Sequence, residues 1–386
     1  NAGNSIASGG NYNVTVGDEA GTALTTGDYL TALGYAAGKT VTTGVRNTYI
    51  GGLAGDAATT ADDNTAVGYA ALSAPGTGTQ NTAIGTAALN VNTDGDNNTA
   101  VGRNALLANT TADNNTAVGY QSLLANTTGA SNVAVGAYAL DANTTGTVNV
   151  AVGTAALGAL TTASYNTALG YAALTTNVTG AQNTAVGYSA LTAATGADNT
   201  AVGSQALSSV AAGTYNTAVG RSAGAAVTTG VQNTLIGGLA GDAITTGNYN
   251  LAIGHQALSA TTTANYNVAV GRSALFTNIL GSHSTAIGIS ALETQNYATA
   301  TAAYNVAVGH EAGLSVTTGI QNTFIGGLAG DANTTANNNT AVGKSSLSAT
   351  TTGGENTAVG TNALATNTTA SNNTAVGTNA LKVNTT

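Results

Sequence analysis

The sequence predicts an all-β protein, a parallel β-roll or β-solenoid of about 22 coils, and three observations support this prediction. A phrase of the type Asn-Thr-Ala-Val-Gly recurs 22 times in the 386 residues, from Asn13 to Asn373. The step between copies is 17 residues, apart from one step of 16 after Asn183 and one of 21 after Ser284. The second residue of the phrase is β-branched in 21 copies, which favours a short strand over a helix. A fixed period of this length indicates repeats that stack on their neighbours.

The places of each coil are numbered here from its first residue, so that coil 115–131 has Asn115 at place 1. Place 5 is Gly in all 22 coils, where a positive φ lets the chain turn a corner. A second corner is expected at place 15, which is Gly or Ala, so each coil should hold two or three short strands. Stacked about 4.8 Å apart, the coils would form a rod on the order of 100 Å long.

Place 1 is Asn in 20 coils. We expect these side-chain amides to stack as a ladder that satisfies buried polar groups along the rod. The alternative is an Asn that only favours a turn.

Apolar residues occupy two pairs of adjacent places. Place 4 is Val, Ile or Leu in all 22 coils beside a place 3 that is mostly Ala, and place 8 is Ala in 20 coils beside Leu or Gly at place 9. Because adjacent strand residues face opposite ways, one column of each pair should fill the coil and the other should form an apolar stripe outside. We expect the place 4 column inside, so that Val118→Asp would disrupt neighbouring coils, while Tyr120→Ser would leave folding nearly intact.

An apolar stripe along the whole rod is larger than the patches that monomeric proteins expose. We therefore expect it to be buried against partner chains, most simply in a closed homotrimer. The alternative is a single thick solenoid with a three-layer interior.

Three coils depart from the pattern in the same way. Place 3 is enlarged in them, and place 9 is Gly both in them and in the coil before each, which predicts that volume gained at one column is given up at another. The enlarged residues are Tyr49, Leu235 and Phe324, and the glycines are Gly38, Gly55, Gly224, Gly241, Gly313 and Gly330. Their Gly-Gly-Leu-Ala-Gly-Asp segments look like ligand-binding glycine loops, but a phosphate-binding loop needs a following Lys-Ser/Thr, which is absent.

We treat residues 1–386 as a single continuous repeat array, although both ends look truncated. Four extra residues lie within 293–304 and are expected to form a bulged corner, since a longer strand would shift the register beyond it. No apolar run approaches the length of a membrane span and no signal peptide is recognisable, so we expect no membrane insertion in this segment.

The net charge is −9, from 16 acidic and 7 basic residues, and no basic face suits nucleic acid. Cysteine and methionine are absent, which suits an oxidising, extracellular setting.

Few residues are candidates for chemistry. His255 and His310 share place 6 but lie three coils apart, roughly 15 Å, too far to bind one metal ion. The acidic turns 62–63 and 94–96 could hold calcium, but they do not repeat in register, and solvated turns are the favoured interpretation. Paired threonines at places 13 and 14 invite an ice-binding interpretation, yet adjacent residues face opposite ways. We therefore expect no catalytic residue, no metal site and no cofactor, and no enzyme.

Place 6 carries the candidate contact residues, because Tyr and Arg often anchor binding interfaces. This column either contacts a receptor or host-surface glycan, or forms cross-chain contacts within an oligomer, and the sequence leaves both open. Its members are Tyr69, Arg103, Tyr120, Tyr171, Tyr188, Arg221, Arg272 and Lys344.

The phrase Asn-Thr-Ala-Val-Gly, with its downstream Ala-Leu and Gly corner, resembles the Asn-Ser-Val-Ala-Ile-Gly repeat of trimeric autotransporter adhesin heads. It is also similar to Asn-Thr-Ala-Ile-Gly-Tyr-Gln-Ala-Leu arrays of phage tail-fibre proteins, as in residues 115–123. The resemblance implies a left-handed parallel β-roll, three chains side by side, and an adhesive or fibre-forming function.

These observations predict a non-enzymatic fibre or adhesin segment, outside the cell on a cell surface or virion, whose partners are other copies of itself and a host-surface glycan or protein. The alternative is a self-assembling filament or surface-layer subunit that stacks end to end. An ice- or glycan-binding solenoid is the third candidate.

Overall fold

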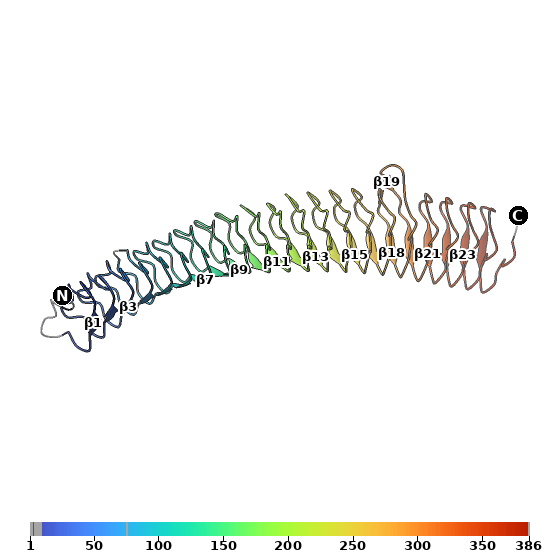
Figure 1. Ribbon diagram of the computed structural model, residues 1–386. Coiled ribbons are helices and arrows are strands. Elements are labelled where there is room, and N and C mark those ends of the chain that lie inside the picture. Colours follow the sequence, from blue (N-terminus) through green and yellow to red (C-terminus); the bar gives the residue numbers. More distant parts are fainter. Residues whose placement is uncertain (1–2, 4–9, 75, 385–386) are drawn as a thin grey trace. The chain divides into compact units, whose positions relative to one another are not determined.

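The computed structural model describes residues 3, 10–74 and 76–384, and within them the chain is all β with no helix (Figure 1). The chain divides into two compact units, residues 1–195 and 196–386, each of which is a parallel β-solenoid. The predicted fold class is confirmed. The single 16-residue step of the repeat lies next to the division.

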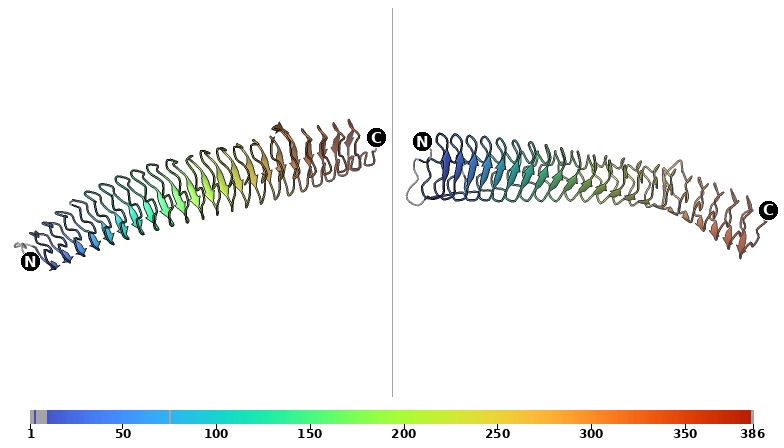
Figure 2. Two further views of the ribbon diagram at one scale, coloured as in Figure 1. Left: turned by 45° about the horizontal axis from the view of Figure 1, so that its top comes forward. Right: turned by 60° about the horizontal axis from the view of Figure 1, so that its bottom comes forward.

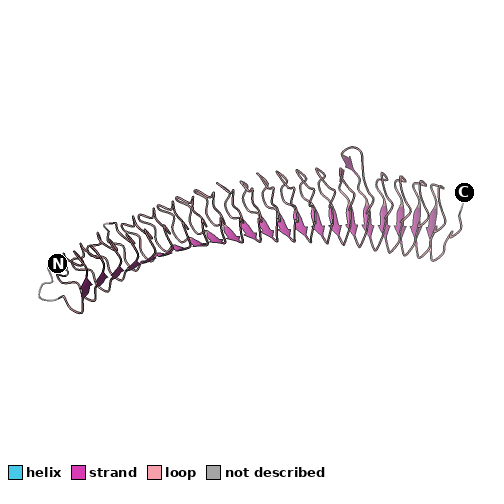
Figure 3. Cartoon of the chain, in the orientation of Figure 1, coloured by secondary structure: helices cyan, strands magenta, loops and turns pink. Residues whose placement is uncertain are grey.

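Unit 1 contributes one three-residue strand from each coil. Figure 3 shows these strands on one side of their coils, with bends and turns completing each coil. They are β1 Val14–Val16, β2 Thr31–Leu33, β3 Thr48–Ile50, β4 Thr65–Val67, β5 Thr82–Ile84, β6 Thr99–Val101, β7 Thr116–Val118, β8 Val133–Val135, β9 Val150–Val152, β10 Thr167–Leu169 and β11 Thr184–Val186.

Unit 2 repeats this arrangement and adds two short strands, one in the coil before the insertion and one within the insertion. Its strands are β12 Thr200–Val202, β13 Thr217–Val219, β14 Thr234–Ile236, β15 Leu251–Ile253, β16 Val268–Val270, β17 Gly281–Ser282, β18 Thr285–Ile287, β19 Thr301–Ala302, β20 Val306–Val308, β21 Thr323–Ile325, β22 Thr340–Val342, β23 Thr357–Val359 and β24 Thr374–Val376.

Equivalent residues of successive coils pair in register. In unit 1, Thr116 of β7 pairs with Val133 of β8, and in unit 2, Thr217 of β13 pairs with Thr234 of β14. Backbone hydrogen bonds hold the coils to both neighbours: Gly119 N–H, for example, donates to Val101 O at 2.8 Å. Within each unit, Figure 2 shows successive coils following the same path. This regular bonding offsets the conformational entropy lost when so many small residues are ordered.

Each coil has one strand in the main sheet where two or three strands were expected, and within the described residues a second strand occurs only in the two coils that contain β17 and β19. Outside places 2 to 4 the chain turns repeatedly, because non-glycine residues at places 7, 9 and 17 take a left-handed φ, as at Gln121 (54°), Leu123 (50°) and Ser131 (60°). Such a conformation is costly for side chains with a Cβ. The backbone N–H groups of these residues donate hydrogen bonds to other coils, as Leu123 N–H does to Ala139 O at 3.0 Å.

The corner glycine at place 5 has the conformation that the sequence predicts. Gly119 has a φ of +139°, and a Cβ there would lie 2.5 Å from the carbonyl oxygen of Gly136 in the next coil. Glycine is therefore required both for the turn and for the close approach of neighbouring coils.

The strand residues face opposite ways, but not in the expected order. Ala117 at place 3 is fully buried, while Val118 at place 4 and Thr116 at place 2 are partly exposed on the outward side. The expectation that place 4 lies inside is wrong, and an aliphatic column instead forms the outward apolar stripe. Small alanines suit the inside because the coil is narrow between the strand and the opposite turns.

Places 8 and 9 are both inside, so the expected outward column of this second pair is absent. Ala139 and Leu140, at these two places, are fully buried. Place 9 is not part of a strand: the positive φ of Leu140 (52°) turns its side chain inward beside the alanine. The alternation rule therefore fails in this segment, because it applies only to extended chain.

The predicted asparagine ladder is confirmed. In unit 1, Asn64 is fully buried, its Oδ1 accepts from Asn81 N–H at 2.9 Å, and its Nδ2 donates to Gly78 O at 2.9 Å. Each amide thus joins one coil to the next and also closes a corner of its own coil. The interpretation of place 1 as a mere turn residue is not needed.

A second ladder, at place 12, was not predicted. Asn109 Nδ2 donates to Asn92 Oδ1 at 2.8 Å, and Asn126 and Asn143 continue the chain of amides at 2.9 Å each. The signal in the sequence is Asn at place 12 in four consecutive coils.

The exchange of volume between places 3 and 9 is confirmed. Tyr49 and Phe324 are fully buried, and a Cβ at Gly55 would lie 2.5 Å from Tyr49 Cδ1. A Cβ at Gly313, in the coil before Phe324, would lie 2.8 Å from Phe324 Cδ2. The large ring fills the space that Leu at place 9 occupies in other coils.

The Asp that ends each Gly-Gly-Leu-Ala-Gly-Asp segment has a structural contact in two of the three copies. Asp56 Oδ1 accepts from Ser73 Oγ at 2.5 Å, and Asp242 Oδ1 accepts from Ser259 Oγ at 2.6 Å, each serine being 17 residues further on. These segments therefore join adjacent coils.

The insertion leaves the main sheet in register. Thr285 of β18 pairs with Val306 of β20 across the 21-residue step, while β19, on the loop that extends beyond its neighbours (Figure 1), pairs with β17 of the preceding coil. Inside, Gln295 Nε2 donates to Ser284 Oγ at 3.0 Å and Asn305 Nδ2 donates to Gln295 Oε1 at 2.9 Å. The insertion thus brings an amide to the one place in unit 2 where the ladder has Ser, and the predicted bulged corner is confirmed.

Candidate functional site

The most extensive candidate surface in each unit is the strand face, defined here as the outward side chains at places 2 and 4. Place 2 is Thr in 16 of the 22 coils and place 4 is aliphatic in all, and neither place holds a charged residue in any coil. Several place 4 side chains are more than one third exposed, among them Leu169 at 48% and Ile287 at 40%. An uncharged face with exposed aliphatic side chains is typical of a surface that is covered by a partner.

Tyrosine is the most frequent residue in the place 6 column of unit 1. Its four predicted tyrosines are 39% to 60% exposed, and Arg103 is exposed beside them. Rings of adjacent coils meet: Tyr171 stacks on Tyr188 with ring centroids 5.6 Å apart, and Tyr120 contacts Tyr138, at place 7 of the next coil, edge to face at 5.3 Å.

Tyr69 lies apart from these pairs, over the backbone of Gly52 in the coil before it. The Cβ that Gly52 lacks would lie 3.6 Å from Tyr69 Cδ2. Of the predicted tyrosines, the structure therefore brings Tyr171 and Tyr188 together, pairs Tyr120 with the unpredicted Tyr138, and leaves Tyr69 single.

The place 6 column of unit 2 is basic instead. Arg221, Arg272 and Lys344 are all exposed, and none of them forms an ion pair within the described residues. Three coils separate the two arginines and four separate Arg272 from Lys344, about 14 and 19 Å at the strand spacing. The three cations therefore do not converge on one small ligand.

A third exposed column, at place 17, was missed by the sequence analysis. In unit 2, Tyr249 stacks on Tyr266 at 5.0 Å, Tyr266 on His283 at 5.0 Å, and His283 contacts Tyr304 at 5.1 Å. In unit 1, Tyr12 stacks on Tyr29 at 5.0 Å. The recurrence of aromatic residues at place 17 in consecutive coils is the signal that could have revealed it.

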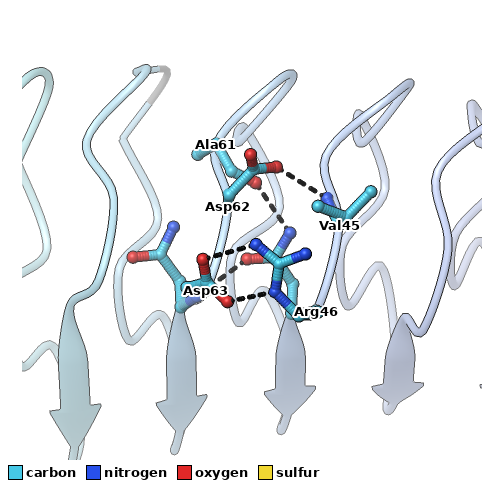
Figure 4. Close-up of polar contacts among 7 residues, drawn as sticks. Val45, Arg46, Ala61, Asp62 and Asp63 are labelled. Atoms are coloured by element: carbon cyan, nitrogen blue, oxygen red, sulfur yellow. Dashed lines mark hydrogen bonds and ion pairs between the residues drawn. The ribbon is translucent and has the colours of Figure 1, made fainter.

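The acidic turns bond to neighbouring coils. Figure 4 shows Asp63 accepting from both Arg46 Nε, at 2.5 Å, and Arg46 Nη2, at 2.8 Å, and Asp62 Oδ1 accepting from Val45 N–H at 2.8 Å. The hydrogen bond from Arg46 holds the pKa of Asp63 below its ordinary value. In the second acidic turn, Asp96 Oδ1 accepts from Thr79 N–H at 2.6 Å.

Burial changes the pKa of a few groups. Desolvation raises the pKa of the Asp141 and Asp331 carboxyl groups and of the Tyr49 and Tyr297 phenols. Within the described residues, no group of three or more His, Cys, Asp or Glu side chains is arranged to bind a metal ion. His255 and His310 lie on the place 6 column, and His310 Nε2 is 3.6 Å from Glu311 Oε1.

Comparison of the chain with protein-family models and with curated proteins finds no match. Among the described residues, no helix is long and apolar enough to cross a membrane.

Proposed function

We propose that this chain is a structural segment of an extracellular fibre or adhesin, on a cell surface or virion, and that it performs no catalysis. The observation that carries the proposal is the strand face: one aliphatic column and one Thr-rich column, without charge, repeated through both units. A segment that presents the same face over many coils suits a spacer that holds a tip or a binding surface away from its base.

The proposal includes self-association through the strand face. Side chains such as Val118 would be removed from water by a second copy, and no charge on either side would be desolvated. A closed homotrimer of left-handed coils is the proposed assembly, in line with the resemblance to trimeric autotransporter adhesin heads and phage tail-fibre arrays. The Ala columns at places 3 and 8 and the Leu column at place 9 cannot supply this contact, because they fill the coil.

Solution mass tests the assembly, with two variants matched in charge. The first variant carries Glu at three place 4 residues of the strand face, and the second carries Glu at three exposed place 14 residues of overlapping coils. The replaced residues are Val101, Val118 and Val135 in the first variant, and Thr111, Thr128 and Thr145 in the second.

We expect the parent chain and the place 14 variant to sediment as trimers and the strand-face variant to sediment as a monomer with an unchanged circular dichroism spectrum. A parent chain that stays monomeric at all concentrations would refute the assembly. Polymers of many lengths would instead support the filament or surface-layer alternative.

Ice or glycan binding is the third candidate, and one observation favours it. Thr at place 2 and the aliphatic residue at place 4 lie on the same outward face, repeated at the strand spacing, as in Thr116 and Val118. Thermal hysteresis of the purified chain tests ice binding, and the absence of hysteresis would exclude it. For a host-surface glycan or protein, the place 6 columns are the proposed contacts, and substitution of Tyr69 or Arg103 should weaken attachment without changing the solution mass.

A further inference from the structure

Three pairs of exposed tyrosines stack face to face between adjacent coils. The ring centroids are 5.0 to 5.6 Å apart and the planes are within 11° of parallel. All six rings are 46% to 76% exposed. The pairs are Tyr12–Tyr29 and Tyr171–Tyr188 in unit 1 and Tyr249–Tyr266 in unit 2.

The backbone holds the two rings of each pair side by side. Both members occupy the same place in neighbouring coils, so their separation follows the strand spacing of about 4.8 Å. Backbone bonds next to the rings maintain it: Tyr29 N–H donates to Asn11 O at 3.0 Å, and Tyr266 N–H donates to Asn248 O at 3.1 Å. The Cα atoms of a pair cannot move apart along the stack without breaking these bonds.

Tyrosine is also the most readily oxidised side chain in this protein. Cys, Met and Trp are all absent, whereas Tyr occurs 15 times. Thiols and thioethers are the usual first targets of oxidants. An oxidant that acts on the folded chain therefore meets exposed phenols first.

We propose that the three stacked pairs are sites of oxidative coupling, at which a haem peroxidase and hydrogen peroxide convert two neighbouring tyrosines into dityrosine. Each phenol loses one electron and one proton to the oxidised peroxidase, which leaves two phenoxyl radicals. A bond forms between one Cε of each ring, and the two Cε hydrogens then move as protons through water to the carbonyl oxygens of the coupled rings, which restores both phenol groups. The protein loses two hydrogen atoms for each link, and one hydrogen peroxide is reduced to two waters.

The surroundings of several other tyrosines indicate that these residues should not be coupled. Tyr49 and Tyr297 are buried, so a peroxidase cannot reach them. Tyr304 contacts His283 instead of another phenol. Tyr69 and Tyr215 have no tyrosine at their place in either adjacent coil of their own unit. The edge-to-face Tyr120–Tyr138 pair lacks the parallel stacking and is not assigned as a site.

Each link would join neighbouring coils covalently in a chain that has no disulfide. It would close a loop of one coil and thereby restrict the unfolded chain more than the folded one. The inference does not depend on the proposed adhesive function, since the geometry lies within one chain.

The test treats the full chain with a haem peroxidase and hydrogen peroxide over a wide range of protein concentrations. Dityrosine is measured by its fluorescence, and the linked residues are identified by mass spectrometry of elastase peptides. We expect the three assigned links, each with the loss of two hydrogens, at a yield per molecule that does not change on dilution. We also expect a higher melting temperature than for chain treated with peroxide alone.

Two matched variants make the assignment specific. Tyr266→Phe keeps a stacked ring but removes the phenol, so the link to Tyr249 should disappear while the other two remain. Tyr215→Phe, an exposed place 17 residue without a stacked partner, should leave all three links at parental yield. The proposal is overturned if the yield falls with dilution, if tyrosines of distant coils are joined as often as the stacked pairs, or if Tyr266→Phe leaves the link pattern unchanged.

Discussion

Replacement of one ladder asparagine, Asn216→Ala in unit 2, should destabilise its coil strongly. Asn216 is fully buried, its Oδ1 accepts from Asn233 N–H at 3.0 Å, and its Nδ2 donates to Gly230 O at 2.8 Å. Alanine would leave the Asn233 N–H and the Gly230 carbonyl buried without these partners. Each unsatisfied group costs about 1–3 kcal/mol, so the local free energy of unfolding should fall by about 2–6 kcal/mol.

Hydrogen exchange is the appropriate assay, because a repeat array can open locally and one global transition does not report a single coil. The amides of residues 199–250 should lose protection by several orders of magnitude in Asn216→Ala, while amides near the far end of unit 2 should change little. Asn296→Ala serves as the control, since Asn296 is exposed and lies outside the ladder. If the two variants lowered protection equally, the assignment of the ladder as a major source of stability would be refuted.

Three further predictions test the face assignment, the core packing and the buried charge. Ala117→Asp should lower the free energy of unfolding by more than about 4 kcal/mol because it buries a charge, whereas Val118→Asp on the strand face should lower that of the single chain by under about 1 kcal/mol. Equal losses of melting temperature in the two variants would contradict the assignment of the two faces. Phe324→Ala should lower the free energy of unfolding, measured with denaturant, by about 3–5 kcal/mol because it leaves a cavity. Adding Gly330→Leu should recover part of this loss, and a double variant that is less stable than Phe324→Ala alone would contradict the volume exchange. Burial raises the pKa of the Asp331 carboxyl group, because the folded state favours its protonated form. When the pH is high enough to ionise this group, its buried charge lowers the free energy of unfolding. Asp331→Asn should therefore melt higher than the parent at neutral pH, and the difference should vanish as the pH falls below the ordinary value of 3.8; a difference independent of pH would refute the cause.

The sequence alone was sufficient to predict the solenoid, the corner glycines, the place 1 ladder and the exchange between Phe324 and its glycines. These features are predictable because each coil contacts nearly identical coils, so that one residue at a given place meets its own equivalent 17 residues away. The candidate column at place 6 was also predictable as an exposed column, since variation at one place of an otherwise constant repeat indicates exposure.

The tertiary structure decided which apolar columns face inward and which exposed residues meet. Val118 and Leu123 are both aliphatic, yet the first lies on the outward strand face and the second is fully buried. The physical reason is the left-handed conformation at places 7, 9 and 17, which is held by hydrogen bonds from other coils and not by local preference. Period-two alternation cannot anticipate such turns, and the stacked tyrosines at place 17 follow from them.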